Sequence, residues 1–263
     1  ALVVEHARER CGSPWQGAAD GGALAQPRGL ALSPDGWFAV ADTGHHRVLW
    51  YTPAGTCLDS FGVEGSAPGA FQEPTGLALA EDGTLAVADT WNGRVQLLLP
   101  DGTVRVVGAE LYGPRGLLWL RDGSLLVADT GNRALLRFAP PRWSREALLR
   151  FRGPVVGLAA VGELVAVALP TEAQVALVDP SRGVEVRRLQ VPGWQGGEQQ
   201  EGYLVVLPSG ELLASAPKPG ELWRLDPSGA REPLRLPAPL PGVTGLAVLP
   251  DGDLLAAQTT EHR

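Results

Sequence analysis

The chain has 263 residues, a formal net charge of −7 and a hydrophobic content of 44%. Its length is enough to bury one sizeable core, and no apolar run approaches the ~20 residues that cross a membrane as a helix. An acidic balance disfavours the phosphate contacts on which nucleic-acid binding depends, so nucleic acid is not the expected partner.

A ten-residue phrase returns six times along the chain. It reads PRGLALSPDG at 27–36, PTGLALAEDG at 74–83 and PRGLLWLRDG at 114–123, and weaker copies begin at 154, 201 and 243. The marker glycines of the six copies are Gly29, Gly76, Gly116, Gly157, Gly202 and Gly245. Repeats spaced by about 40 to 47 residues are typical of arrays of small supersecondary units.

Each repeat contains four short apolar runs separated by turn residues. In the second repeat they are Leu77–Leu79, Leu85–Ala88, Val95–Leu99 and Val104–Val107. Such runs, bounded by Asp-Gly pairs, predict strands joined by hairpins. We therefore predict an all-β fold, a six-bladed β-propeller with four antiparallel strands per blade. The first strand of each blade should line a central channel, and residues 141–149 should form a long turn in the third blade.

The two ends of the chain add up to about one further repeat. We therefore predict a single domain over residues 1–263, in which the N- and C-terminal segments share the last blade and residues 1–12 complete it. The alternative is that this blade lacks a strand. The chain contains no Met, so we expect it to be part of a larger protein. A closed ring leaves no unpaired sheet edge at its ends to which another chain could add a strand. We therefore expect a monomer.

The two cysteines, Cys11 and Cys57, fall at opposite ends of outer strands in this frame. The two ends of such a strand are four residues apart, so the two cysteines would be separated by about 13 Å, which is beyond the reach of a disulfide. The frame therefore predicts two free thiols.

The second half of each strong repeat carries a further motif. It reads VADTGHHRVLWY at 40–51, VADTWNGRVQLL at 87–98 and VADTGNRALLRF at 127–138. Together with the P-x-G-L start, this pattern resembles the NHL repeat family. The resemblance covers residues 11–139 well; in the last three repeats the Asp of VADT is replaced by Ala168, Ala216 and Gln258. It implies a six-bladed ring used mostly as a binding platform, although some related propellers are lyases or lactonases and others bind RNA.

Asp42, Asp89 and Asp129 end the second strand of the first three blades. A carboxylate here accepts backbone N–H groups of the following loop or pairs with the recurring arginine. Because the motif repeats in every strong copy, we expect a structural role, with a metal or catalytic role as the alternative.

The residue before each marker glycine should lie at the mouth of the channel. Around the ring these residues are Arg28, Thr75, Arg115, Val156, Glu201 and Thr244. Arginine suits the capture of carboxylate or phosphate groups, so Arg28 and Arg115 are candidates for holding a small anionic ligand. The alternative is that they form salt bridges with acidic loop residues.

The turns between second and third strands, with the links between blades, should form one face of the ring, the top face. Trp91 stands where the other strong repeats have Gly44 and Gly131, and Trp194 lies in the longest linker. Both are candidate anchors for a partner, or else they fill gaps between blades. His45 and His46 also lie there, but adjacent side chains point in different directions, so a metal site is not expected.

The sequence contains none of the standard catalytic signatures for serine hydrolases, metalloproteases or P-loop enzymes. We therefore assign no catalytic residue, metal ligand or cofactor. The expected function is a non-enzymatic binding, sensor or scaffold module, with a protein partner or small ligand at the top face. The alternatives are a metal-dependent lyase or lactonase and an RNA-binding propeller that uses the arginines of blades 1 to 3.

Overall fold

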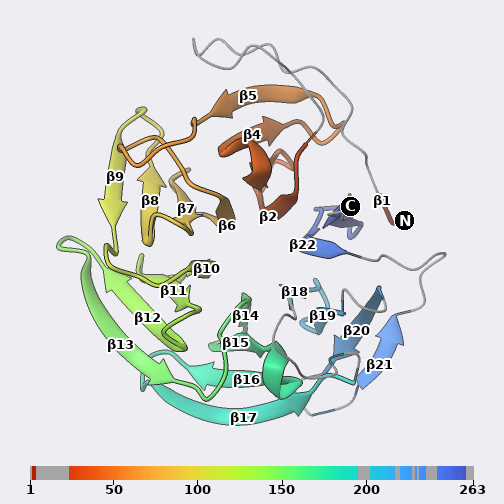
Figure 1. Cartoon of the computed structure of the whole chain (residues 1–263). Coiled ribbons are helices and arrows are strands. Elements are labelled where there is room, and N and C mark those ends of the chain that lie inside the picture. The colour runs from red at the N-terminus through yellow and green to blue at the C-terminus, as the bar shows by residue number, and fades with distance from the viewer. Residues whose placement is uncertain are drawn as a thin grey trace.

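A computed structural model describes residues 2–3, 24–192, 194, 202–216, 220–226, 229, 231–234 and 242–258. Within these residues the fold is all-β, apart from two short 3-10 turns, η1 (Thr43–His45) and η2 (Pro170–Glu172). Four-stranded antiparallel sheets surround a centre, with one edge of each sheet inward and the other at the perimeter (Figure 1). The predicted propeller architecture is therefore confirmed.

Five sheets have four strands each, and in each the strands follow one another in chain order from the inner edge outward. Blade 1 contains β2 (Pro27–Leu32), β3 (Phe38–Asp42), β4 (Arg47–Tyr51) and β5 (Cys57–Phe61). Blade 2 contains β6 (Pro74–Leu79), β7 (Leu85–Asp89), β8 (Arg94–Leu98) and β9 (Val104–Val107). Blade 3 contains β10 (Pro114–Trp119), β11 (Leu125–Asp129), β12 (Ala134–Ala139) and β13 (Ser144–Arg150). Blade 4 contains β14 (Leu158–Val161), β15 (Leu164–Leu169), β16 (Gln174–Asp179) and β17 (Val184–Gln190). Blade 5 contains β18 (Leu204–Val206), β19 (Leu212–Ala216), β20 (Glu221–Leu225) and β21 (Arg231–Leu234).

The prediction of six four-stranded blades is wrong, because the structure has five. The gap between blades 5 and 1 is occupied by a smaller sheet of three strands, here called the closing sheet, in the order β1 (Leu2–Val3), β23 (Leu254–Gln258) and β22 (Val243–Val248). Strand β1 pairs in parallel with Leu254 and Leu255, whereas the third strand of each blade is antiparallel to the second. Of residues 1–12, only Leu2 and Val3 are described, so the rest of the predicted closure lies outside the described residues.

The parallel direction of β1 has a physical cause. In the five blades a tight turn joins the second strand to the third, and this connection makes the pair antiparallel. No turn joins β1 to β23, which lie at opposite ends of the sequence, so nothing in the connection dictates their relative direction.

Two smaller predictions are also corrected. Residues 144–150 form the edge strand β13 instead of a long turn. Strand β13 is mostly exposed and pairs with β12 through its backbone, so it lacks the apolar alternation by which a strand is recognised in a sequence. Cys57, at the start of β5, is disulfide-bonded, so the prediction of two free thiols is wrong. The other cysteine of the chain, Cys11, lies outside the described residues.

The hydrophobic core lies between neighbouring sheets. Between blades 2 and 3, for example, Ala88 and Leu97 pack with Leu125 and Phe138, all of them buried. Each blade thus buries its two faces against its neighbours, as expected for sheets arranged around an axis. No helix among the described residues is long and apolar enough to span a membrane.

Candidate functional site at the channel mouth and top face

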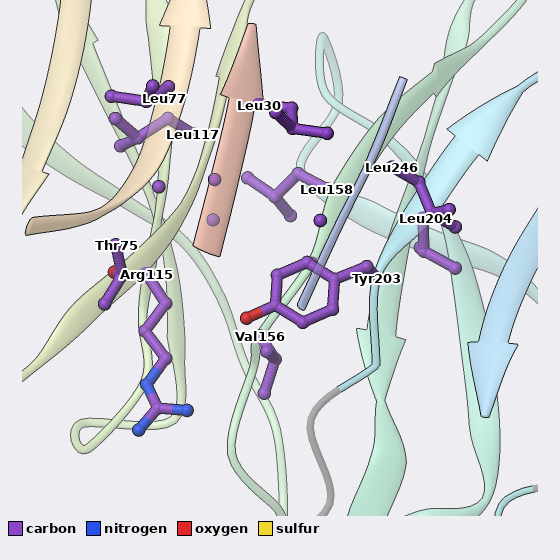
Figure 2. A pocket seen from close by; sticks show the side chains of 15 residues that line it. Leu30, Thr75, Leu77, Arg115, Leu117, Val156, Leu158, Tyr203, Leu204 and Leu246 are labelled. Atoms are coloured by element: carbon purple, nitrogen blue, oxygen red, sulfur yellow. The ribbon is translucent and has the colours of Figure 1, made fainter. Parts of the chain in front are cut away.

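The inner strands surround a cavity of about 80 Å³ on the axis of the ring. Leucines of the first strands, including Leu30, Leu77 and Leu117, line one end (Figure 2). Arg115 and the hydroxyl of Tyr203 lie at the other end, with Val156 beside them (Figure 2). Arg115 follows Pro114, which pairs with Asp129, the last residue of β11. The turn after β11 belongs to the top face, so the polar end of the cavity is on that face.

The marker glycines explain why the cavity is so narrow. A Cβ atom on Gly76 would lie 1.7 Å from the carbonyl oxygen of Arg115, and one on Gly29 would lie 2.2 Å from that of Thr75. The same relation holds for Gly116 with Val156, Gly157 with Gly202 and Gly245 with Arg28. Only a residue without a side chain permits this backbone approach, so the recurring glycine follows from the packing of the inner strands.

The series of glycine–carbonyl contacts is interrupted at Gly202. A Cβ atom there would lie 2.5 Å from the indole of Trp194 instead. Trp194 is only 3% exposed, and its Nε1 donates to the carbonyl of Ser215 at 2.6 Å. Trp194 therefore lies in the core beside blade 5, which is the gap-filling alternative that its sequence position allowed.

The other residues predicted at the channel mouth occupy different environments. Thr75 and Arg115 line the cavity, and Arg28 does not. Thr75 is buried, with its Oγ1 2.7 Å from that of Thr90, while Arg28 and Arg115 are half-buried. Glu201 lies outside the described residues.

The sequence interpretation missed Tyr203, which lies in the cavity beside the site predicted for Glu201. The signal was present: the residue after the marker glycine is leucine in five repeats, and Tyr203 is the exception. Its ring takes the place of a leucine side chain and brings a hydroxyl to the polar end of the cavity (Figure 2).

Trp91 is the most exposed tryptophan that the structure describes. It is 64% exposed, whereas the six other described tryptophans are buried or half-buried. Its Nε1 donates to Oε2 of Glu73 at 2.7 Å, and its backbone N–H donates to the carbonyl of Gln72 at 3.1 Å. A second exposed aromatic side chain, Tyr112, is 67% exposed and lies on the next link between blades.

The two histidines bind different partners. Nδ1 of His45 is 2.9 Å from Oδ2 of Asp42, which also accepts from Nε of Arg47 at 2.8 Å. Nδ1 of His46 accepts the backbone N–H of Glu73 at 3.0 Å. Among the residues that the structure describes, no three or more His, Cys, Asp or Glu side chains are grouped so as to hold a metal ion.

The repeated aspartates bind groups of their own blades. The carboxylate of Asp89 accepts from the backbone N–H of Gln72, from Nδ2 of Asn92, from Nε of Arg94 and from Nε2 of Gln96. These bonds tie the turn after β7 to the preceding linker. Asp42 and Asp129 accept the N–H groups of Ala25 and Tyr112 in the same way, each at 2.7 Å, as a structural role requires.

Comparisons with known proteins identify the repeat and the fold. The NHL repeat model matches residues 24–51 and 71–96. No curated protein sequence matches the chain. Virginiamycin B lyase from Staphylococcus aureus superimposes with a TM-score of 0.69 at 11% identity, over 88% of this chain and 77% of that one. A gluconolactonase from Xanthomonas campestris gives a TM-score of 0.68 at 17% identity, over 89% and 83% of the two chains. A chain of a nidogen/laminin complex gives 0.64 at 17% identity, over 81% of each chain. At these identities the similarity establishes the fold alone.

Proposed function

Because the chain is an NHL-repeat β-propeller protein, we propose that it is a non-enzymatic binding module that holds a protein partner on its top face. The observation that carries the proposal is the exposure of Trp91 on a turn where the neighbouring strong repeats have glycine. An exposed, rigid aromatic side chain on a loop of a fixed scaffold is the usual form of a binding hot spot. Tyr112 provides a second aromatic contact on the adjacent blade.

The test compares partners captured by the wild-type protein and by the Trp91→Gly variant. This substitution restores the residue found at the matching position of the other strong repeats, so we expect it to fold normally. A partner protein should be retained by the wild type and lost with the variant. The matched control is Leu58→Ala, which removes an exposed apolar side chain from the outer strand β5. Identical sets of bound proteins for wild type and Trp91→Gly would overturn the proposal.

A small anionic ligand at the channel mouth is a second candidate, supported by Arg115 and Tyr203 at the polar end of the cavity. A volume of about 80 Å³ suits a few atoms only. Inorganic phosphate or acetate should raise the melting temperature of the wild type but not of an Arg28→Ala/Arg115→Ala variant. We expect the double variant itself to fold; a large loss of melting temperature without ligand would show that the two arginines are structural.

The enzyme alternative, a metal-dependent lyase or lactonase, is supported by similarity of fold. Metal analysis of the purified protein separates it from the binding module, because a stoichiometric divalent ion at the channel mouth would favour the enzyme. Nucleic acid remains the less favoured partner on the grounds of charge.

A further inference from the structure

Trp91 and Glu73 are joined by a side-chain hydrogen bond, and the backbone around each is hydrogen-bonded as well. Besides the bond from Nε1 of Trp91 to the Glu73 carboxylate at 2.7 Å, the backbone N–H of Trp91 donates to Gln72 at 3.1 Å. The backbone N–H of Glu73 donates in turn to Nδ1 of His46 at 3.0 Å, which fixes Glu73 in a left-handed conformation with φ of 49°. Both side chains stay exposed. A carboxylate is therefore fixed at the edge of an exposed indole before any partner arrives, which lowers the entropy lost on binding.

The surroundings of this pair are acidic. Two linkers flank the turn that carries Trp91: residues 62–73, which bind it through Asn92 Nδ2 to Gly65 O at 2.8 Å, and residues 108–113, which bind it through Leu111 N to Gly93 O at 2.8 Å. They contain the exposed residues Glu64, Glu73 and Glu110 and no lysine or arginine. These three glutamates make the electrostatic potential around Trp91 negative, and the net charge of the whole chain, −7, has the same sign. Both therefore attract cations to this part of the surface.

The basic residues of this turn and of the neighbouring turns bind other groups. Arg94, at the end of the same turn, donates through Nε to Asp89 at 2.7 Å and through a terminal nitrogen to the carbonyls of Ala67 and Ala70. Nδ1 of His46 accepts the backbone N–H of Glu73. Arg133 belongs to the equivalent turn of blade 3, one blade away. Neither of these two arginines is bonded to Glu73.

From this geometry we propose that the Trp91–Glu73 pair binds a cationic side chain, arginine above all, presented by the protein partner. The proposal rests on the proposed function and specifies the chemistry of that partner. Tryptophan is the best of the aromatic rings for a cation above its face. A guanidinium group stacked on the indole can also donate to the Glu73 carboxylate at the ring edge, which a compact ammonium does less well.

The experiment selects random peptides displayed on phage for binding to the wild-type protein, after depletion on Trp91→Gly. We expect the selected peptides to be enriched in arginine or lysine. Affinities of the best peptides are then measured by fluorescence polarisation against Glu73→Gln, in which an amide oxygen can still accept from Trp91 Nε1 while the charge is gone. Affinity should fall at least five-fold in this variant and on replacement of the peptide arginine by uncharged citrulline. Leu58→Ala should bind as the wild type does.

The outcomes separate the two proposals. Trp91-dependent peptides without basic residues would overturn the cation proposal and leave the protein-binding function standing. A selection that yields no Trp91-dependent peptide would overturn both. Basic peptides that bind Trp91→Gly or Glu73→Gln as tightly as the wild type would show general attraction to an acidic protein, and they too would overturn the cation proposal.

Discussion

The single hydrogen that serves as the side chain of Gly76 sets the spacing of two blades. We expect Gly76→Ala to lower the free energy of unfolding by about 3 kcal/mol or more, because its Cβ would lie 1.7 Å from the Arg115 carbonyl oxygen and backbone would have to move. Urea denaturation measures the change.

The matched control for this prediction is Gly113→Ala. Gly113 has a φ of 62°, and no neighbouring atom lies within 4 Å of the position that a Cβ atom would take there. This variant therefore meets only the cost of a left-handed alanine, about 1 kcal/mol. Equal losses in the two variants would mean that the inner strands can separate without penalty and that the close approach does not hold the ring.

Tyr51 gives the protein a defined sensitivity to alkaline pH. Burial raises the pKa of Tyr51 to about 12, and the Asp42 carboxylate adds to the rise. In the unfolded chain the phenol titrates near pH 10, so the native state keeps a proton that the unfolded state loses. The stabilising effect is complete below about pH 10 and is lost as the pH rises towards 12.

We therefore expect Tyr51→Phe to flatten the fall of unfolding free energy over this range, by at most about 1.4 kcal/mol per pH unit. The chain has a single lysine, Lys218, so few other groups titrate there. Denaturation curves at several alkaline pH values test this, with Tyr112→Phe as the exposed control. The same pH slope in Tyr51→Phe and wild type would contradict the prediction.

Single residues were predictable where the sequence repeats them. The marker glycines and the strand-ending aspartates recur, and their recurrence indicates structural roles that agree with the contacts of Gly76 and Asp89. Tyr203 was missed because it departs from the motif, standing once at a position where the other five repeats have leucine. The hydrogen bond between Trp91 and Glu73 was also not predictable, because it joins residues 18 apart whose proximity depends on the packing of linker against turn.

At the level of elements, Trp194 takes over a contact that strand backbones make elsewhere. Strand β18 has three residues, half the length of β2, β6 or β10, and the indole lies against Gly202 just before it. We expect Trp194→Ala to cost about 3 to 5 kcal/mol, because it removes a buried ring and leaves the Ser215 carbonyl without its donor. Far-UV circular dichroism during denaturation measures this without relying on tryptophan fluorescence.

Trp91→Ala is the natural comparison, since its side chain is 64% exposed. Its cost should stay below about 1 kcal/mol, as for most surface substitutions. If Trp194→Ala were as mild as Trp91→Ala, the indole of Trp194 would not be needed to join blade 5 to its neighbours.

Strands that are buried along their whole length were the most readily predicted. Strands such as β7 and β11 are buried along their whole length and appear in the sequence as Val, Leu and Ala runs between turn signals. Strand β13 is solvent-facing, so its sequence carries arginine and glutamate instead and gives no strand pattern. The outer strand β9 was still predicted, because its valines lie between turn residues, whereas β13 is held by backbone pairing that composition does not reveal.

At the level of the whole molecule, residue counting predicted the presence of a closing segment but not its construction. A sum of lengths says nothing about the direction in which a terminal strand enters a sheet, and β1 enters in parallel over two residues. The prediction of a complete sixth blade failed at this point.

The closing sheet should therefore be the least protected sheet among the described residues. We expect hydrogen–deuterium exchange to be faster in residues 243–258 than in residues 114–129, because β23 gains fewer cross-strand bonds from β1 than β11 gains from β12. Mass spectrometry of peptic fragments measures the difference. Equal protection of the two regions would indicate that the closing sheet opens only when the whole domain unfolds.

The contacts between inner strands also bear on how anything could use the centre of the ring. Because the backbones of neighbouring inner strands are already in contact, the central cavity cannot widen for a large ligand unless neighbouring blades separate. The centre of the ring is thus a shallow depression and not an open channel. A large molecule would have to bind over it, and the loops of the top face would then decide which molecule is recognised.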